Sequence, residues 1–130
     1  MMTLKIEDKE LNIKYGYEAT LKTRLLSRMA KLEKAKDDSM EGMEDILLFL
    51  PDFLLVGLQK FHADEYGFNY ETSDGKDEQL EKMYPLIEAY IDGNEDTDAI
   101  TFYNQLTNEM LANGFLKKQF QAELNKVETA

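Results

Sequence analysis

The most apolar stretch of the sequence is Ile46–His62, which reads ILLFLPDFLLVGLQKFH. Nearly every position is apolar, so a helix here would bury almost its whole circumference, as the central helix of a core does. Pro51 cannot donate a backbone hydrogen bond and disfavours helical backbone at the residue before it. It therefore either kinks this helix or begins a new one. We expect Ile46–Phe61 to be the most buried segment of the chain, bent at Pro51.

The segment before this stretch has helical spacing. Asp38, with Glu41 three residues later, fits a capping box at the start of the apolar helix. Upstream, the spacing predicts one helix over Tyr17–Lys34, with an inward face made of Tyr17, Leu21, Leu25, Met29 and Leu32.

The first sixteen residues have the period of a strand instead. Leu4 and Ile6, and then Leu11, Ile13 and Tyr15, alternate with polar residues up to Gly16. This pattern predicts a β-hairpin with one apolar face. Because a lone hairpin is marginal in water, its apolar face must pack on the helices that follow.

Downstream of His62 the pattern predicts a polar connection and two more helices. Alternating Tyr66, Phe68 and Tyr70 fit a short extended piece. Leu80–Ile91 has helical spacing and contains Pro85, which kinks the helix unless it begins only a few residues earlier. Asp96 or Thr97 can cap the next helix, with Ala99, Ile100, Tyr103, Leu106, Met110 and Leu111 facing inward. Asn113–Gly114 ends it, with Gly114 suited to the left-handed conformation.

Together these elements predict a single, mainly α domain over residues 1–130. It consists of an N-terminal hairpin (1–16), a helical core of about four to five helices (17–115) and an amphipathic tail with a frayed end (116–130). The 130 residues are 43% hydrophobic, which is enough for one core.

The composition excludes several chemistries. The chain has no Cys, so disulfides, thiolate catalysis and iron–sulfur clusters are ruled out. The only histidine, His62, stands near Asp64 and Glu65, but a lone His at a helix end is more typical of a cap or a surface group than of a zinc ligand. No calcium loop, phosphate-binding glycine loop or nucleophile motif is complete. We therefore expect no enzyme and no catalytic, cofactor-binding or metal residues.

The net charge of −11 is unevenly distributed. Residues 1–36 carry nine basic and five acidic side chains, whereas residues 37–115 carry three and nineteen. Nucleic acids require clustered Lys and Arg, so no nucleic-acid binding is expected. The polarity favours head-to-tail self-association or docking on a basic partner, or else it only keeps the protein soluble. The apolar run is short for a membrane span and the N-terminus has no signal-peptide core, so we expect a soluble intracellular protein.

Two regions are candidates for partner binding. The tail carries an amphipathic stripe that either packs on this domain or waits for a partner, and the polar connection carries alternating aromatic residues. The candidate residues are Leu116, Phe120, Leu124 and Val127 in the tail and Tyr66 and Phe68 in the connection. The seven Met residues fall mostly on apolar faces, which favours core filling over an adaptable surface.

The order of these segments resembles the tail assembly chaperones of long-tailed phages and prophages of Gram-positive bacteria. Four segments carry the resemblance, which spans residues 3 to about 118: Leu4–Tyr17 (LKIEDKELNIKYGY), Ile46–His62, Leu86–Ile91 (LIEAYI) and Leu111–Leu116 (LANGFL). The family has no catalytic or ligand signature, so no functional residue can be transferred.

The resemblance implies a non-enzymatic assembly factor in the cytoplasm of the bacterial host, absent from the mature virion. Such proteins bind the phage tape measure protein, keep it soluble and bring it together with tail tube subunits. Family members are often also made in a longer, frameshifted form. The alternative from the residues alone is an acidic regulatory protein that binds a single cellular or phage protein. An enzyme without a readable motif is a third interpretation.

Overall fold

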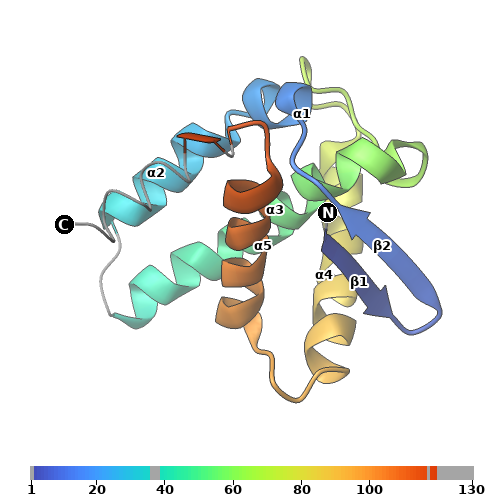
Figure 1. Ribbon diagram of the computed structural model, residues 1–130, viewed down its shortest axis with the longest axis vertical. Coiled ribbons are helices and arrows are strands. Elements are labelled where there is room, and N and C mark those ends of the chain that lie inside the picture. The colour runs from blue at the N-terminus through green and yellow to red at the C-terminus, as the bar shows by residue number, and fades with distance from the viewer. Residues whose placement is uncertain (1, 36–38, 117, 120–130) are drawn as a thin grey trace.

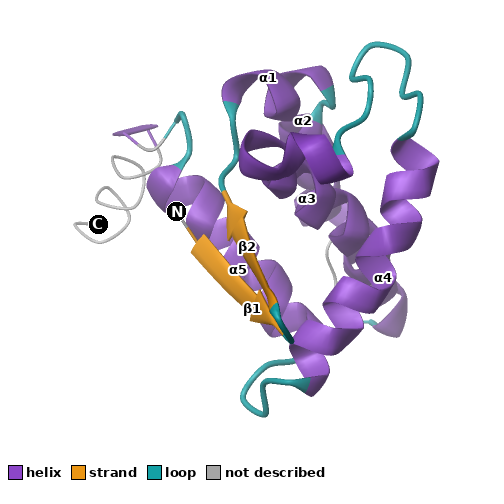
Figure 2. Cartoon of the chain, turned by 90° about the vertical axis from the view of Figure 1, so that its right-hand side faces the viewer, coloured by secondary structure: helices purple, strands orange, loops and turns teal. Residues whose placement is uncertain are grey.

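The computed structural model describes residues 2–35, 39–116 and 118–119. A two-stranded antiparallel hairpin is followed, over these residues, by five helices in one small domain (Figures 1 and 2). The elements are β1 (Met2–Ile6), β2 (Lys9–Ile13), α1 (Tyr17–Lys22), α2 (Leu25–Ala35), α3 (Met40–Tyr66), α4 (Lys76–Asp92) and α5 (Ala99–Asn113). The predicted fold class, mainly helical with an N-terminal hairpin, is confirmed.

The hairpin packs its apolar face on the second half of α3. Strand residue Leu4 is opposite Leu11, and both are buried together with Ile6 and Ile13. Two hydrogen bonds hold the edge of β2 to α3: the Lys14 backbone N–H donates to the Gly57 carbonyl (3.0 Å) and the Asn12 N–H to Nε2 of His62 (2.9 Å). The only histidine of the chain thus docks the hairpin, which is a structural role at a helix end.

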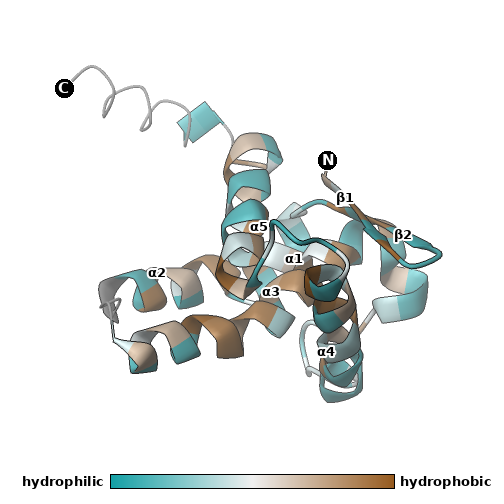
Figure 3. Ribbon diagram, turned by 90° about the horizontal axis from the view of Figure 1, so that it is seen from below, coloured by the Kyte–Doolittle hydropathy of each residue, from teal (hydrophilic) through white to brown (hydrophobic). Residues whose placement is uncertain are grey.

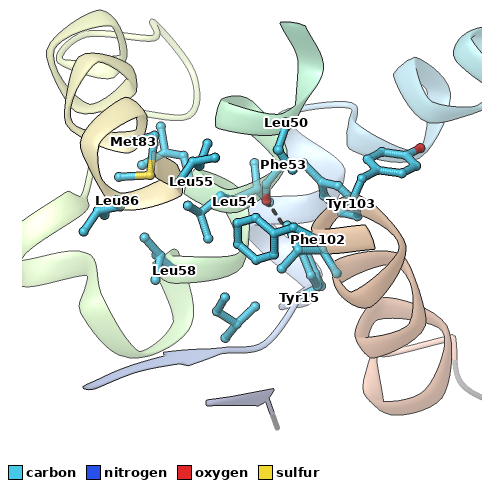
Figure 4. Packing of buried hydrophobic residues seen from close by; sticks show 14 of the residues in the cluster. Tyr15, Leu50, Phe53, Leu54, Leu55, Leu58, Met83, Leu86, Phe102 and Tyr103 are labelled. Atoms are coloured by element: carbon cyan, nitrogen blue, oxygen red, sulfur yellow. Dashed lines mark hydrogen bonds between the residues drawn. The ribbon is translucent and has the colours of Figure 1, made fainter. Parts of the chain in front are cut away.

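The core is centred on α3. Residues Phe53 to Val56 and Leu58 are fully buried. Figure 4 shows Leu54 and Leu55 beside Met83 of α4, with Phe53 on the other side near Tyr15 and the α5 residues Phe102 and Tyr103. The Tyr15 hydroxyl donates to the Phe53 carbonyl at 2.9 Å. The prediction that Ile46–Phe61 is the most deeply buried segment is confirmed for its middle, although Leu47, Leu48 and Phe61 are exposed.

The predicted bend at Pro51 is wrong. Helix α3 continues through Pro51, and its non-helical backbone lies at His62 (φ −128°, ψ 28°), where the imidazole accepts the hydrogen bond from β2. Proline already has the φ value of a helix, and burial among apolar side chains offsets its missing hydrogen bond. Helix α4 likewise runs through Pro85, nine residues after its start.

The single helix predicted over Tyr17–Lys34 is two helices. The break lies at Thr23–Arg24, where Arg24 has the left-handed φ of 57° and the Thr23 hydroxyl bonds back to the Ala19 carbonyl at 2.6 Å. The turn redirects the chain, so the inward face predicted for this segment is only partly correct. Leu25 and Met29 are buried, whereas Tyr17 and Leu21 are exposed.

Four details of the helix ends and the connection also differ from prediction. Ser39 caps α3 by accepting from the Gly42 N–H (3.1 Å), and the expected cap, Asp38, lies outside the described residues. Asp98, not Asp96 or Thr97, caps α5 through the Thr101 N–H (2.8 Å). Gly114 has extended backbone rather than the left-handed conformation. The residues Tyr66, Phe68 and Tyr70 form no strand: the first ends α3, and the others lie in a loop.

A partly buried ion triad joins three helices. Both terminal nitrogens of Arg28 in α2 donate to the carboxylate of Asp52 in α3 (2.8 and 3.0 Å), and Nζ of Lys76 in α4 lies 3.2 Å from the same group. Burial raises the pKa of Asp52, but the hydrogen bonds and charges of Arg28 and Lys76 outweigh it, so the pKa is lower than usual. Pairing in the folded state therefore favours the ionised form of Asp52.

This triad predicts acid-sensitive stability. Because the pKa of Asp52 is lowered on folding, its contribution is present above the ordinary value of 3.8 and is lost as pH falls through the lower folded-state pKa. We expect Asp52→Asn to lower the free energy of unfolding in urea at pH 7, and the difference from wild type to shrink at pH 3. Asp45→Asn, at an exposed site on the same helix, is the matched control. If Asp52→Asn lowered the free energy of unfolding equally at pH 7 and at pH 3, the role assigned to the triad would be contradicted.

Candidate interaction surfaces

The described residues hold no obvious chemical centre. Among them, no group of three His, Asp or Glu side chains is arranged to hold a metal ion. Helix α3 is, within the described part of the chain, the one helix long and apolar enough to cross a membrane by length and composition. Half of its most apolar 18-residue stretch is buried inside this fold. The functional candidates are therefore exposed apolar surfaces.

The first surface is on the first half of α3. Met40, Met43 and Leu47 follow one another at helical spacing and are exposed; we call them the α3 stripe. The stripe continues along the same face into Leu54 and Leu58, which are completely buried. Figure 3 shows this apolar character extending along α3 beside α2. One continuous apolar face is thus covered in its second half and open to solvent in its first.

The arrangement of α2 explains why this half of the face is open. Helix α2 packs on a different side of α3, where Ile46 and Phe49 are buried with Met29. Figure 1 shows α2 and the first half of α3 extending together away from α4 and the hairpin. Exposed Glu41, Glu44 and Asp45 alternate with the stripe. The result is an apolar surface with acidic margins.

The second surface is a cleft beside α1, which we call the aromatic cleft. It has a volume of about 300 Å³ and its walls include Lys14, Tyr17, Lys60 and Phe115. The rings of Tyr17 and Phe115 meet edge to face with centroids 5.2 Å apart, and Tyr17 remains 66% exposed. Neither lysine forms an ion pair with any described residue. This surface combines two exposed aromatic rings with two basic side chains.

The third surface is on α4, where Tyr84 is 50% exposed. Glu81 and Glu88 stand three residues before and four residues after it, so the three side chains share one face of the helix. We call this face the Tyr84 ridge. Both glutamates are exposed, and neither is ion-paired within the described part of the chain.

The structure places the predicted partner-binding residues in different environments. Tyr66 is buried and accepts a hydrogen bond from Nζ of Lys9 (3.4 Å), so it belongs to the core that holds the hairpin rather than to an open surface. Phe68 is half-buried, and its ring packs edge to face on Tyr70 at 5.2 Å. Leu116 is half-buried beside Leu26 and Met110. Phe120, Leu124 and Val127 lie outside the described residues.

The predicted basic surface is partly neutralised within the chain. Arg28 is engaged with Asp52, and Lys22 pairs with both Glu18 (3.5 Å) and Glu71 (2.6 Å). In the acidic segment 37–115, the carboxylate of Asp98 is engaged as the cap of α5. Lys14 and Lys60, at the aromatic cleft, are among the basic residues that form no ion pair with any described residue.

Sequence reasoning missed all three surfaces. Tyr17 was expected in the core, because nothing in the sequence indicated the break at Arg24. The apolar pattern around the α3 stripe predicts a helix that is buried on nearly all sides, so the pattern gives no sign that the stripe is exposed. One available signal was the acidic residues between its members, since Glu41, Glu44 and Asp45 are hard to bury without partners.

Comparison with known proteins finds no matching family model, no similar curated protein and no similar solved structure.

Proposed function

We propose that this chain is a non-enzymatic tail assembly chaperone that acts in the cytoplasm of a bacterial host and is absent from the mature virion. It binds the tape measure protein, keeps it soluble and helps to recruit tail tube subunits during tail morphogenesis. The proposal joins the order of segments in the sequence to the surfaces of the fold.

The observation that carries the proposal is the α3 stripe, the solvent-exposed half of the apolar face of α3. An exposed apolar helix face can bind the apolar face of another amphipathic helix. The bound helix is then anchored by apolar side chains that recur at helical spacing. Met40 and Met43 supply flexible side chains that adjust to different helical sequences. Such a surface suits a client that presents many similar amphipathic segments.

The acidic margins of the stripe fit the same role. Glu41, Glu44 and Asp45 stay in solvent around a bound helix, so each bound copy would add negative charge to the client and oppose its aggregation. The stripe is also short, so each contact is modest. A modest contact can be released when the tail tube takes the place of the chaperone.

Co-expression with a candidate tape measure protein, followed by affinity capture of the client, tests the proposal. The wild-type chain is expected to be captured and to keep the client soluble. Met43→Ser with Leu47→Ser should weaken capture at least tenfold, because each buried apolar side chain contributes about 1.5–3 kcal/mol. Phe61→Ser is the matched control, since Phe61 is similarly exposed on α3 but lies outside the stripe. Equal capture of both variants would refute the assignment of the stripe.

The alternative function is an acidic regulator of a single protein, and it could use the same stripe to bind one amphipathic helix with basic flanks. The number of copies in the complex separates the two. A chaperone that coats an elongated client is expected to bind in several copies per client chain, whereas a regulator binds one to one. Light scattering on the captured complex measures this ratio.

A further inference from the structure

We infer that the aromatic cleft of one copy binds the Tyr84 ridge of a second copy, which links copies of this chain head to tail. This inference concerns surfaces separate from the α3 stripe and does not depend on the identity of the client.

The aromatic cleft has the properties of a docking site. It is open, and Tyr17 and Phe115 present ring surface to solvent at its wall. The aliphatic chain of Lys60 passes close to Gly16, where an added Cβ would lie 3.5 Å from Cδ, so the charged end of this lysine stands at the cleft margin. Lys14 is a second positive charge there. An aromatic or aliphatic side chain between two carboxylates would complement this arrangement.

The Tyr84 ridge offers that combination. Its tyrosine is exposed on the outer face of α4, with Glu81 on one side along the helix and Glu88 on the other. A tyrosine placed against the rings of the cleft can pack edge to face, as Tyr17 and Phe115 already do with each other. The two glutamates would then lie near Lys14 and Lys60. Each of these four charged side chains lacks an ionic partner among the described residues of its own chain and would gain one in the contact.

The overall charge favours a second copy as the occupant. Copies with a net charge of −11 repel one another, so an approach is favoured only where one presents positive potential to another. The aromatic cleft places two basic side chains without an ionic partner among the described residues, Lys14 and Lys60, beside the exposed rings of Tyr17 and Phe115. The acidic α4 face of another copy is complementary to it in both charge and apolar character.

The contact is heterologous, because cleft and ridge are different surfaces of one chain. Figure 2 shows α1 and α4 along different edges of the molecule. Each copy can therefore offer its cleft to one neighbour and its ridge to another. Such a contact produces an open chain of copies, or a ring if the rotation closes.

Sedimentation analysis of the full chain over a range of concentrations tests this inference through charge reversal. Wild type is expected to associate as concentration rises, and less at 500 mM salt than at 50 mM. Lys60→Glu, or Glu81→Lys with Glu88→Lys, should raise the concentration needed for association at least tenfold, because like charges then face each other. Lys31→Glu and Glu95→Lys, both at exposed positions outside the two surfaces, are the matched charge controls and should associate as wild type does.

Mixing the two kinds of variant gives the decisive result. In the mixture, the altered cleft of the Lys60→Glu protein meets the altered ridge of the double variant, while the unaltered cleft and ridge also meet. Association should therefore return when the two proteins, each unable to associate alone, are combined. Circular dichroism of each variant confirms that it is folded. A wild-type monomer at every concentration, variants that associate normally, or a mixture that stays monomeric would overturn the inference.

The outcome is separable from the test of the proposed function. Substitution of the α3 stripe, Met43→Ser with Leu47→Ser, should leave self-association unchanged. If client capture succeeds while the charge-reversal mixture stays monomeric, the chaperone proposal stands and the head-to-tail contact is wrong. If copies associate as expected but no client is captured, the head-to-tail contact stands and the chaperone proposal is wrong.

Discussion

Leu54→Asp is expected to abolish cooperative folding of the chain. Leu54 is fully buried in the middle of α3, where Figure 4 shows it surrounded by side chains of the core. A carboxylate there has no basic partner and loses its hydration, and changes of this kind cost more than about 4 kcal/mol. Since small domains are typically stable by about 5–15 kcal/mol, most of that stability would be lost. Thermal unfolding followed by circular dichroism measures the effect.

Leu48→Asp is the control for this experiment. Leu48 lies on the same helix and is 65% exposed, so a carboxylate at this position remains hydrated. Its melting temperature should stay close to that of the wild type. Normal thermal stability of the Leu54→Asp protein would show that α3 is not the centre of the core.

Gly57→Ala is expected to destabilise the chain by about 1–3 kcal/mol, the usual cost of overpacking a filled core. A Cβ at this position would lie 2.8 Å from Cγ2 of Ile13 and 3.0 Å from Cζ of Tyr15. Neither neighbour can move easily, because both are buried and the Tyr15 hydroxyl is held by the Phe53 carbonyl. Alanine is more favourable than glycine inside a helix by about 1 kcal/mol. A net decrease in the free energy of unfolding would therefore reflect the steric clash between α3 and the hairpin. Urea unfolding gives the free energy.

Gly16→Ala provides the comparison. A Cβ there would meet Cδ of Lys60 at an ordinary 3.5 Å, and its φ of −81° suits any residue. We expect no loss of stability, or a small gain from reduced freedom of the unfolded chain. If the two glycine variants behaved alike, the close approach of Ile13 and Tyr15 to Gly57 would not be the cause.

Local pattern was sufficient to predict the hairpin and the central helix α3. The period-two alternation of Leu4 to Tyr15 and the apolar run around Phe53 each specify one element with one buried face. Both lie where they were expected, because burial of a periodic face dominates local preference. The break at Arg24 could not be predicted in the same way. A non-glycine residue with positive φ reflects the packing of the helices on either side of it, and the sequence 22–26 carries no glycine or proline to indicate a turn.

The interaction surfaces were harder to predict for a related reason. Periodicity shows that Met43 and Leu47 share a face with Leu54, but not how far along that face another helix extends. Coverage of this face depends on contacts distant in the sequence, such as those of Leu54 with Met83 in α4. Likewise, Lys14, Tyr17, Lys60 and Phe115 come together only through the fold.

The docking of the hairpin on α3 sets the order in which the chain can fold during synthesis. The strands leave the ribosome before α3 does, because Gly57 and His62, which hydrogen-bond to Lys14 and Asn12, come 43 and 50 residues later in the chain. A two-stranded hairpin alone is marginal in water, so β1 and β2 gain a stable partner only after α3 has emerged. Until then, the apolar face of Leu4 and Leu11 is open to the surroundings. During synthesis the hairpin is therefore vulnerable to aggregation until α3 has emerged from the ribosome.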